Sequence, residues 1–263
     1  MQEVVSGFEG AEGPVWVDKG YLLFSDTRAE KIYKLTPGAK PSVFREASGG
    51  ANGNAIDRRG QLYTCEYKSR RVTRTDAKGT VATIADNFEG KRLNAPNDIV
   101  VRRDGNVYFT DPLFTPLDAR ELDFYGVFHI SPSGKLSVIA KPDGRPNGIA
   151  LSPDGKVLYV ANTDEKNVRA YDLDRAGGVS KERVLISDLP AGPDGLKTDA
   201  NGTLYIACSG VQIYTSRGEH VGTIEVPGGA RNLAFGDSDF KTLYITGRTT
   251  LYRARVAVKG ARP

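Results

Sequence analysis

Four side chains with oxygen donors stand at matching places in the sequence, each just before an apolar segment. They are Glu12, Asn97, Asn147 and Asp194, in Glu-Gly-Pro-Val-Trp, Pro-Asn-Asp-Ile, Pro-Asn-Gly-Ile and Pro-Asp-Gly-Leu. Two carboxylates and two amide oxygens suit a hard divalent cation such as Ca²⁺, which takes about six to eight oxygen ligands, better than they suit zinc. We therefore predict a metal site with water in the remaining positions. Asn and Asp before Gly are also common turn formers, so one such motif alone would indicate only a bend.

The segments that carry these residues belong to a sixfold repeat. Each repeat opens with an apolar strand start, passes through a turn and ends in a second apolar strand, which in five of the six repeats contains Leu-Tyr or Val-Tyr. The strand starts lie 37 to 50 residues apart, at Trp16, Ile56, Ile99, Ile149, Leu196 and Leu233. A repeat of this length, made of short strands and Gly-rich turns, is typical of propeller blades. We predict an all-β, six-bladed β-propeller of four-stranded antiparallel blades that fills residues 1–263 as a single domain.

Closure of the ring is predicted from its two ends. The last repeat, residues 231–256, supplies only three strands, and the run Glu3-Val-Val5 has no partner in the first repeat. We expect this N-terminal strand to complete the last blade, since pairing there removes an exposed sheet edge. The first strands of all blades then start at one face near the axis, so the four oxygen donors are expected to share one central pit.

Composition narrows the classes of function. The 36 basic and 32 acidic residues give a net charge of +4, spread along the chain, whereas nucleic-acid binders usually show a clustered basic face. No apolar stretch reaches the 18 residues of a membrane span, and the start of the chain lacks the features of a signal peptide. Cys65 and Cys208 fall in opposite blades, so we expect free thiols in a reducing compartment. The expectation is a cytoplasmic protein, a monomer by preference, that binds neither nucleic acid nor a membrane.

Blade three contains a long loop between Asp111 and Gly126. The loop follows the strand end that lies beside Asn97, and long loops with aromatic residues are often functional. We expect it to cover the pit and to influence substrate preference through Phe124, Tyr125 and the stretch Leu113-Phe-Thr-Pro116. A solvated surface loop is the alternative.

Five motifs together resemble the gluconolactonase/regucalcin family, which includes senescence marker protein and luciferin-regenerating enzymes. They are Glu-Gly-Pro-Val-Trp (12–16), Arg-Leu-Asn-Ala-Pro-Asn-Asp (92–98), Arg-Pro-Asn-Gly-Ile-Ala-Leu-Ser-Pro-Asp-Gly (145–155), Gly-Pro-Asp-Gly (192–195) and Thr-Leu-Tyr-Ile-Thr (242–246). The similarity runs over essentially the whole chain, and the order and spacing of the motifs are specific. It implies a six-bladed propeller that holds a catalytic divalent cation, usually Ca²⁺. The implied metal ligands are Glu12, Asn147 and Asp194, with Asn97 as a ligand or substrate contact.

The resemblance also suggests roles around the metal. Arg92 and Asn94 resemble substrate-contact positions. Arg231 stands where relatives often have Pro-x-Asn, and its charge would either favour anionic substrates or pair with a neighbouring carboxylate. Asp98, Asp111 and Glu66 lie at neighbouring strand starts and ends, where they could orient the amide ligands; for Glu66 a place on the solvated rim is the alternative.

Together with these residues, the resemblance implies a metal-dependent lactonase that acts on a sugar lactone or a similar cyclic ester. A bound cation would polarise the lactone carbonyl and lower the pKa of a bound water. Asp194 is the candidate general base or attacking group, and Glu12 would compensate charge. Ca²⁺ is the expected cofactor, with Zn²⁺, Mg²⁺ or Mn²⁺ as substitutes. The alternatives are phosphotriester hydrolysis at the same metal and a non-catalytic propeller that binds a metabolite or calcium. A pure scaffold has no need of four oxygen ligands, which disfavours the last.

Overall fold

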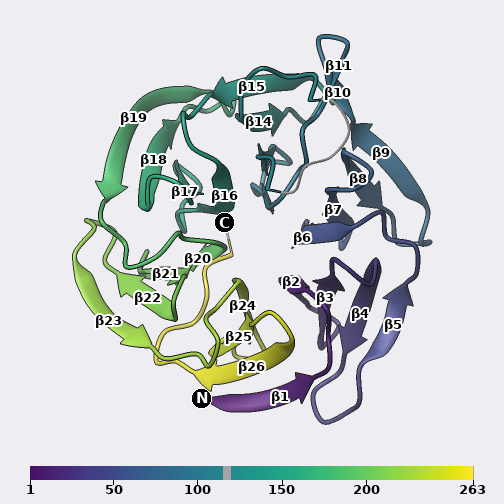
Figure 1. Ribbon diagram of the computed structural model, residues 1–263, viewed down its shortest axis with the longest axis vertical. Helices are drawn as coiled ribbons and strands as arrows, with labels where there is room; N and C mark the ends of the chain where they lie inside the picture. Colours follow the sequence, from purple (N-terminus) through teal and green to yellow (C-terminus); the bar gives the residue numbers. More distant parts are fainter. Residues whose placement is uncertain (115–119, 263) are drawn as a thin grey trace.

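Six four-stranded antiparallel sheets stand around one axis like the blades of a propeller (Figure 1). The computed structural model describes residues 1–114 and 120–262, and no helix occurs within these ranges, hence none that could cross a membrane. The predicted all-β, six-bladed architecture is confirmed. In each of the first five blades the strands follow in chain order from the axis outward (Figure 1).

The first three blades occupy the N-terminal half of the chain. Blade one consists of β2 (Ala11–Val17), β3 (Tyr21–Asp26), β4 (Lys31–Leu35) and β5 (Ser42–Arg45). Blade two consists of β6 (Ala51–Ile56), β7 (Leu62–Glu66), β8 (Arg71–Thr75) and β9 (Val81–Ala85). A small hairpin of β10 (Asn87–Phe88) and β11 (Lys91–Arg92) follows. Blade three consists of β12 (Ile99–Val101), β13 (Val107–Asp111), β14 (Gly126–Ile130) and β15 (Leu136–Ala140).

The other three blades complete the ring. Blade four consists of β16 (Pro146–Leu151), β17 (Val157–Asn162), β18 (Asn167–Leu173) and β19 (Val179–Ile186). Blade five consists of β20 (Leu196–Thr198), β21 (Leu204–Ala207), β22 (Val211–Tyr214) and β23 (His220–Ile224). Blade six consists of β24 (Asn232–Gly236), β25 (Thr242–Thr246), β26 (Thr250–Arg255) and β1 (Gln2–Ser6).

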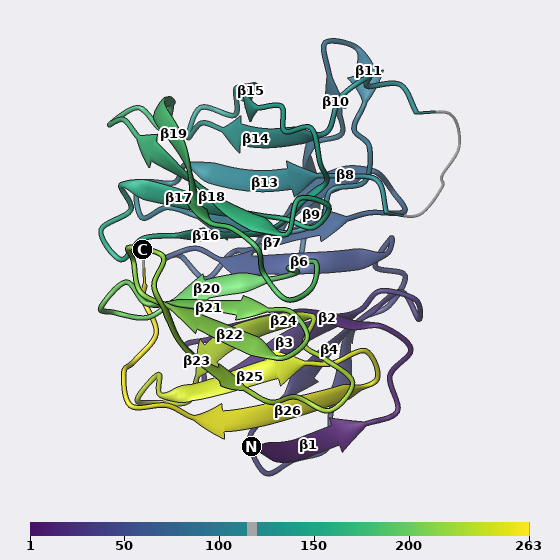
Figure 2. The same cartoon turned by 60° about the vertical axis from the view of Figure 1, so that its left-hand side comes forward.

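The N-terminal strand closes the ring, as predicted. β1 pairs antiparallel with β26, with Gln2 opposite Arg253 and Ser6 opposite Thr250 (Figure 2). Val4 and Val5 of β1 also pack against the apolar cluster that joins blades one and six. The N-terminal strand is therefore held in the last blade by backbone hydrogen bonds and by burial of its side chains, and this closes the ring.

Deleting residues 1–6 is expected to lower the unfolding midpoint by several degrees and to promote aggregation. The deletion exposes the edge of β26 and removes the packing of two valines, each worth about 1–2 kcal/mol if half of the side chain is buried. Differential scanning calorimetry and size-exclusion chromatography measure both effects. A truncated chain that melts like the full chain and elutes at the same volume would show that β1 does not hold the ring closed.

The second strand of each blade is the buried layer that positions the first. All five residues of β7, of β13 and of β25 are buried, because each of these strands lies between two neighbours in its own sheet and faces adjacent blades on both sides. This explains the near-continuous apolar runs in the repeat. Trp16 of blade one stacks on Tyr244 of blade six at 5.8 Å between ring centroids. Cys65 and Cys208 are buried free thiols, as predicted.

Candidate active site

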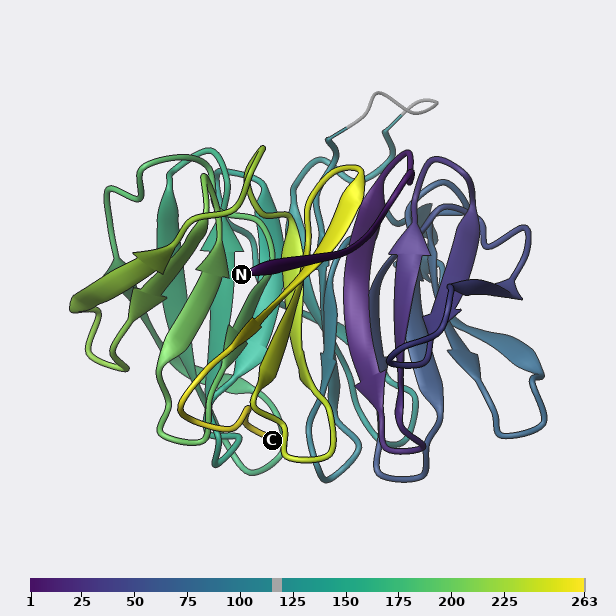
Figure 3. The ribbon, with the colours of Figure 1, turned by 90° about the horizontal axis from the view of Figure 1, so that it is seen from below.

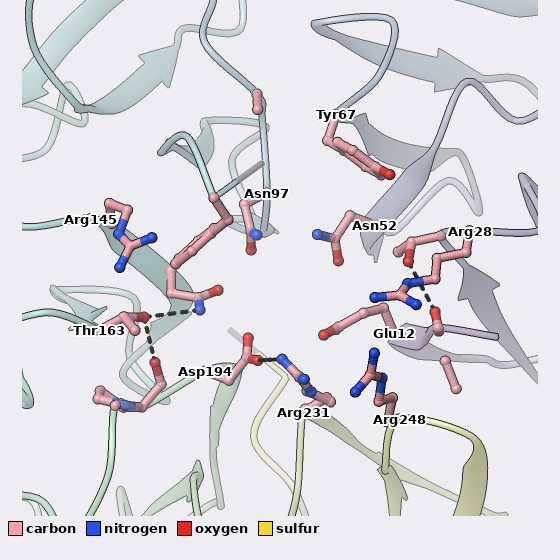
Figure 4. A pocket seen from close by; sticks show the side chains of 18 of the residues that line it. Glu12, Arg28, Asn52, Tyr67, Asn97, Arg145, Thr163, Asp194, Arg231 and Arg248 are labelled. Carbon is pink, nitrogen blue, oxygen red and sulfur yellow. Dashed lines mark hydrogen bonds and ion pairs between the residues drawn. The ribbon is translucent and has the colours of Figure 1, made fainter. Parts of the chain in front are cut away.

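One residue from each blade lines a cavity of about 350 Å³ at one end of the axis. In chain order they are Glu12, Asn52, Asn97, Asn147, Asp194 and Arg231. Figure 4 labels all of these except Asn147 and shows the labelled side chains around a common centre. Each of these residues stands in the first two positions of the first strand of its blade or one or two residues before that strand. The loops at this end, including residues 7–10 and 247–249, lie at the upper edge of Figure 3, and the C-terminal residues lie at the opposite end. The structure therefore brings the four predicted oxygen donors and Arg231 together.

Glycines after four of these six residues let the strand starts converge. A Cβ on Gly13 would lie 1.8 Å from the carbonyl oxygen of Asn52, and one on Gly148 would lie 2.2 Å from that of Asp194. Instead, the Gly148 N–H donates to the Asp194 carbonyl at 3.1 Å, and Gly195 likewise donates to Arg231 at 2.8 Å. The glycines in the Glu-Gly, Asn-Gly and Asp-Gly motifs are thus required for close backbone approach between blades.

Asp194 and Arg231 form an ion pair at the cavity. The Oδ2 atom of Asp194 lies 3.5 Å from Nη1 of Arg231. Burial raises the pKa of Asp194 to about 7, and the Arg231 charge opposes this shift. Burial, followed by the repulsion of Asp194, raises the pKa of Glu12 well above its usual value. A cation bound between these two buried carboxyl groups would stabilise their ionised forms.

Asn147 has its amide fixed on one side only. Its Nδ2 donates to Thr163 Oγ1 at 3.1 Å, and Thr163 in turn donates to the Pro193 carbonyl at 2.8 Å (Figure 4). This chain sets the amide orientation, and the buried Oδ1 has no hydrogen-bond partner among the described residues. A buried acceptor without a partner costs about 1–3 kcal/mol, so it is a place where a cation or a water would bind favourably.

The donor set fits a hard divalent cation. No group of three or more His, Cys, Asp or Glu side chains with metal-site spacing occurs in residues 1–114 and 120–262. Here the donors are two carboxylates plus amide oxygens, a mixture that suits Ca²⁺ better than it suits zinc. The unpartnered Asn147 oxygen and the carboxyl groups with raised pKa both support this fit.

Asp98 and Asp111 are buried acceptors for backbone N–H groups near the cavity. Asp98 accepts from Ile99 at 2.9 Å and from Ile149 at 3.3 Å, which ties β12 to β16. Asp111 accepts from Asn94 and Ala95, both at 2.8 Å, and burial raises its pKa to about 7. These two aspartates hold the backbone on either side of Asn97.

Glu66 lies elsewhere. It is 1% exposed and pairs with Arg45 of β5 at 2.7 Å and Arg71 of β8 at 2.6 Å, so it joins blades one and two. It does not line the cavity and does not lie on a solvated rim.

Four residues predicted as substrate contacts lie outside the cavity lining. Arg92 is exposed on β11. Asn94 is buried and donates to the carbonyls of Asp111 and Phe124, at 3.1 and 2.9 Å. Phe124 packs against the core of blades two and three, and Tyr125 lies beneath the Arg120 guanidinium.

Phe114 is the aromatic side chain of the blade-three loop that lines the cavity, with the Arg145 guanidinium 4.7 Å above its ring. It falls within the predicted stretch 113–116. The rest of the predicted loop between 115 and 119 lies outside the described residues.

Several lining residues carry no motif of their own. Asn52 holds the position of Glu12 in blade two, and its Asn-Gly pair repeats the pattern of Asn147-Gly148. Arg28, Tyr67, Thr163 and Arg248 come one or two residues after the second strand of a blade ends. Because the first two strands are antiparallel, these positions lie beside the strand starts. The blade-three loop was predicted to lie near Asn97 because it follows the second strand of its blade. By the same argument, the positions of these four residues after the second strands of the other blades would have predicted that they line the cavity.

The fold and the cavity define a six-bladed propeller with a polar site on its axis, and the comparisons name its family. Residues 10–249 match the SMP-30/Gluconolactonase/LRE-like region, and the chain belongs to this family. It is 34% identical to a gluconolactonase of Zymomonas mobilis, over 99% of this chain and 82% of the relative. A solved structure of a gluconolactonase from Xanthomonas campestris is 32% identical, has a TM-score of 0.90, and matches 98% of this chain and 88% of its own. These findings confirm the resemblance seen in the sequence.

Proposed function

We propose that this protein is a lactone-opening hydrolase that uses a divalent cation, Ca²⁺ by preference, in the axial cavity. The observation that carries the proposal is the convergence of Glu12, Asp194 and the oriented amide of Asn147 at one end of the axis. The names of the relatives, gluconolactonase from Zymomonas mobilis and from Xanthomonas campestris, support the reaction class.

Glu12, Asn147 and Asp194 would hold the cation, with Asn97 as a further ligand or a substrate contact. When bound, the cation polarises the lactone carbonyl and lowers the pKa of a nearby water. Asp194 accepts the proton of the water that attacks the carbonyl carbon. The ring C–O bond then breaks, and the proton passes to the leaving alkoxide oxygen, which yields the hydroxy acid.

Arg231 and Glu12 assist Asp194 in this scheme. The Arg231 guanidinium, 3.5 Å from Asp194, favours the ionised carboxylate that the base requires. Glu12 supplies the second negative charge that the cation needs.

The reaction class is tested by comparing three substrates on the calcium-loaded protein. We expect acid release from glucono-1,5-lactone far above the spontaneous rate, measured at constant pH, and little turnover of an aryl phosphotriester or an aryl ester. Replacing Ca²⁺ by Zn²⁺, Mg²⁺ or Mn²⁺ should retain part of the rate. Faster phosphotriester than lactone hydrolysis would favour that alternative chemistry, and no turnover of any substrate would favour a binding protein.

A further inference from the structure

Three arginines crowd one wall of the cavity. Arg28 follows β3 of blade one, Arg248 follows β25 of blade six, and Arg231 immediately precedes β24 (Figure 4). Their side chains reach the cavity around Glu12, on the side opposite Arg145. Guanidinium groups repel one another, so three on one wall favour the binding of a negatively charged group.

The backbone that carries these arginines is tightly held. Asp26 accepts hydrogen bonds from the N–H groups of Glu9, Gly10 and Ala29, which fixes the loops on both sides of Arg28. The Arg248 carbonyl accepts from Ala11 at 2.9 Å. The loops of blades one and six are thus joined, and the two arginines start from anchored positions.

The charges on this wall do not balance within the protein. Arg231 pairs with Asp194, and on the other wall Arg145 pairs with Asp164. Arg28 and Arg248 form no ion pair with any side chain in the described ranges, although the carboxylate of Glu9 also lines the cavity. When Glu12 and Asp194 hold a divalent cation, their charge is neutralised by it, and the wall is left with excess positive charge.

We propose that Arg28, Arg231 and Arg248 form a subsite for an anionic group, so that the preferred substrates are sugar lactones bearing a carboxylate or phosphate away from the ring ester. This inference rests on the proposed lactonase function. Guanidinium groups bind carboxylates and phosphates through paired N–H donors. A neutral sugar lactone would leave Arg28 and Arg248 without a charged partner.

Two matched substrate pairs test the subsite. The first is glucaro-1,4-lactone, with a free carboxylate, against glucono-1,4-lactone. The second is 6-phosphoglucono-1,5-lactone against glucono-1,5-lactone. We expect kcat/KM to be at least tenfold higher for the anionic member of one pair. A preference in the first pair identifies a carboxylate as the bound group, and a preference in the second pair identifies a phosphate. Added salt should reduce that preference, since the arginines are exposed.

Single variants connect the preference to the arginines. Arg28→Gln and Arg248→Gln should each lower the anionic-to-neutral ratio of kcat/KM about tenfold. The matched control is Arg217→Gln, an exposed arginine on a blade-five turn that pairs with Glu219 outside the cavity, and it should keep the wild-type ratio. An equal or higher kcat/KM for the neutral member, or an unchanged ratio in both variants, would overturn the subsite while leaving lactone hydrolysis intact.

A binding measurement separates failure of the subsite from failure of the proposed function. If neither pair is hydrolysed, the lactonase proposal fails. Isothermal titration of the calcium-loaded protein with glucarate and with gluconate then tests the subsite by itself. Tighter binding of the dianion, lost in Arg28→Gln, supports the anionic subsite, and equal binding of the two acids overturns it.

Discussion

Replacing Asp194 by alanine is expected to lower kcat/KM for lactone hydrolysis at least a hundredfold and to remove most Ca²⁺ binding. The change deletes both a charged ligand and the proposed general base, a role worth about 10²–10⁴ in rate. The fold should persist because Asp194 is held through its backbone, which bonds Ala207 and Gly148. Its removal also relieves repulsion on Glu12.

Metal content and rate should be measured together on this variant. Asp239→Ala is the matched control, since Asp239 is an exposed aspartate that pairs with Arg255 and does not line the cavity. It should keep wild-type metal content and rate. A double Glu12→Ala, Asp194→Ala variant that still binds one equivalent of metal with wild-type affinity would sink the assignment of these ligands.

The metal-free protein is expected to lose stability as the pH rises from about 5 to 7.5. The folded-state pKa of Asp194 is raised to about 7 and that of Glu12 is raised as well, whereas unfolded carboxyl groups titrate near 4. Between about pH 4 and 7 the folded state therefore binds more protons than the unfolded state, so the free energy of unfolding falls with increasing pH. Below about pH 4 both carboxyl groups are protonated in the folded and the unfolded state, so they do not make the free energy of unfolding depend on pH.

Calcium should remove much of this loss, because the cation stabilises the ionised carboxylates. We expect Ca²⁺ to raise the unfolding midpoint more at pH 7.5 than at pH 5, by on the order of 5 °C. Asp111 also has a pKa raised to about 7 by burial, so part of the decrease in the free energy of unfolding with rising pH should remain when calcium is bound. The Glu12→Gln, Asp194→Asn variant isolates that remainder. A calcium effect equal at both pH values would contradict the coupling.

The repeat made the fold predictable from the sequence. The alternation of apolar and polar residues around Trp16, Ile99 and Leu233 predicted strands that are buried between blades. The last repeat supplied only three strands, so the N-terminal strand was expected to be its fourth. The positions of the cavity-lining residues followed from the same register, because the residue at the start of the first strand has the same place relative to the axis in every blade. Asn147 and Asp194 were found in this way.

Side-chain roles at the edges of the site depended on information that register does not contain. Phe124 and Phe114 belong to the same loop, and only the packed structure shows that the first enters the core and the second the cavity. Glu66 occupies the repeat position of Asp111, yet it pairs with Arg71 of the next strand and with Arg45 of the neighbouring blade. Arg28 and Arg248 were missed because they follow strands instead of starting them.

Hydrolysis of glucono-1,5-lactone by metal-free and calcium-restored protein tests the central claim most directly. The rate above the spontaneous reaction should vanish after chelation and removal of the chelator, and should return on adding Ca²⁺ to the wild-type protein but not to Asp194→Ala. Hydrolysis at the full rate by protein shown to contain no metal would contradict the account.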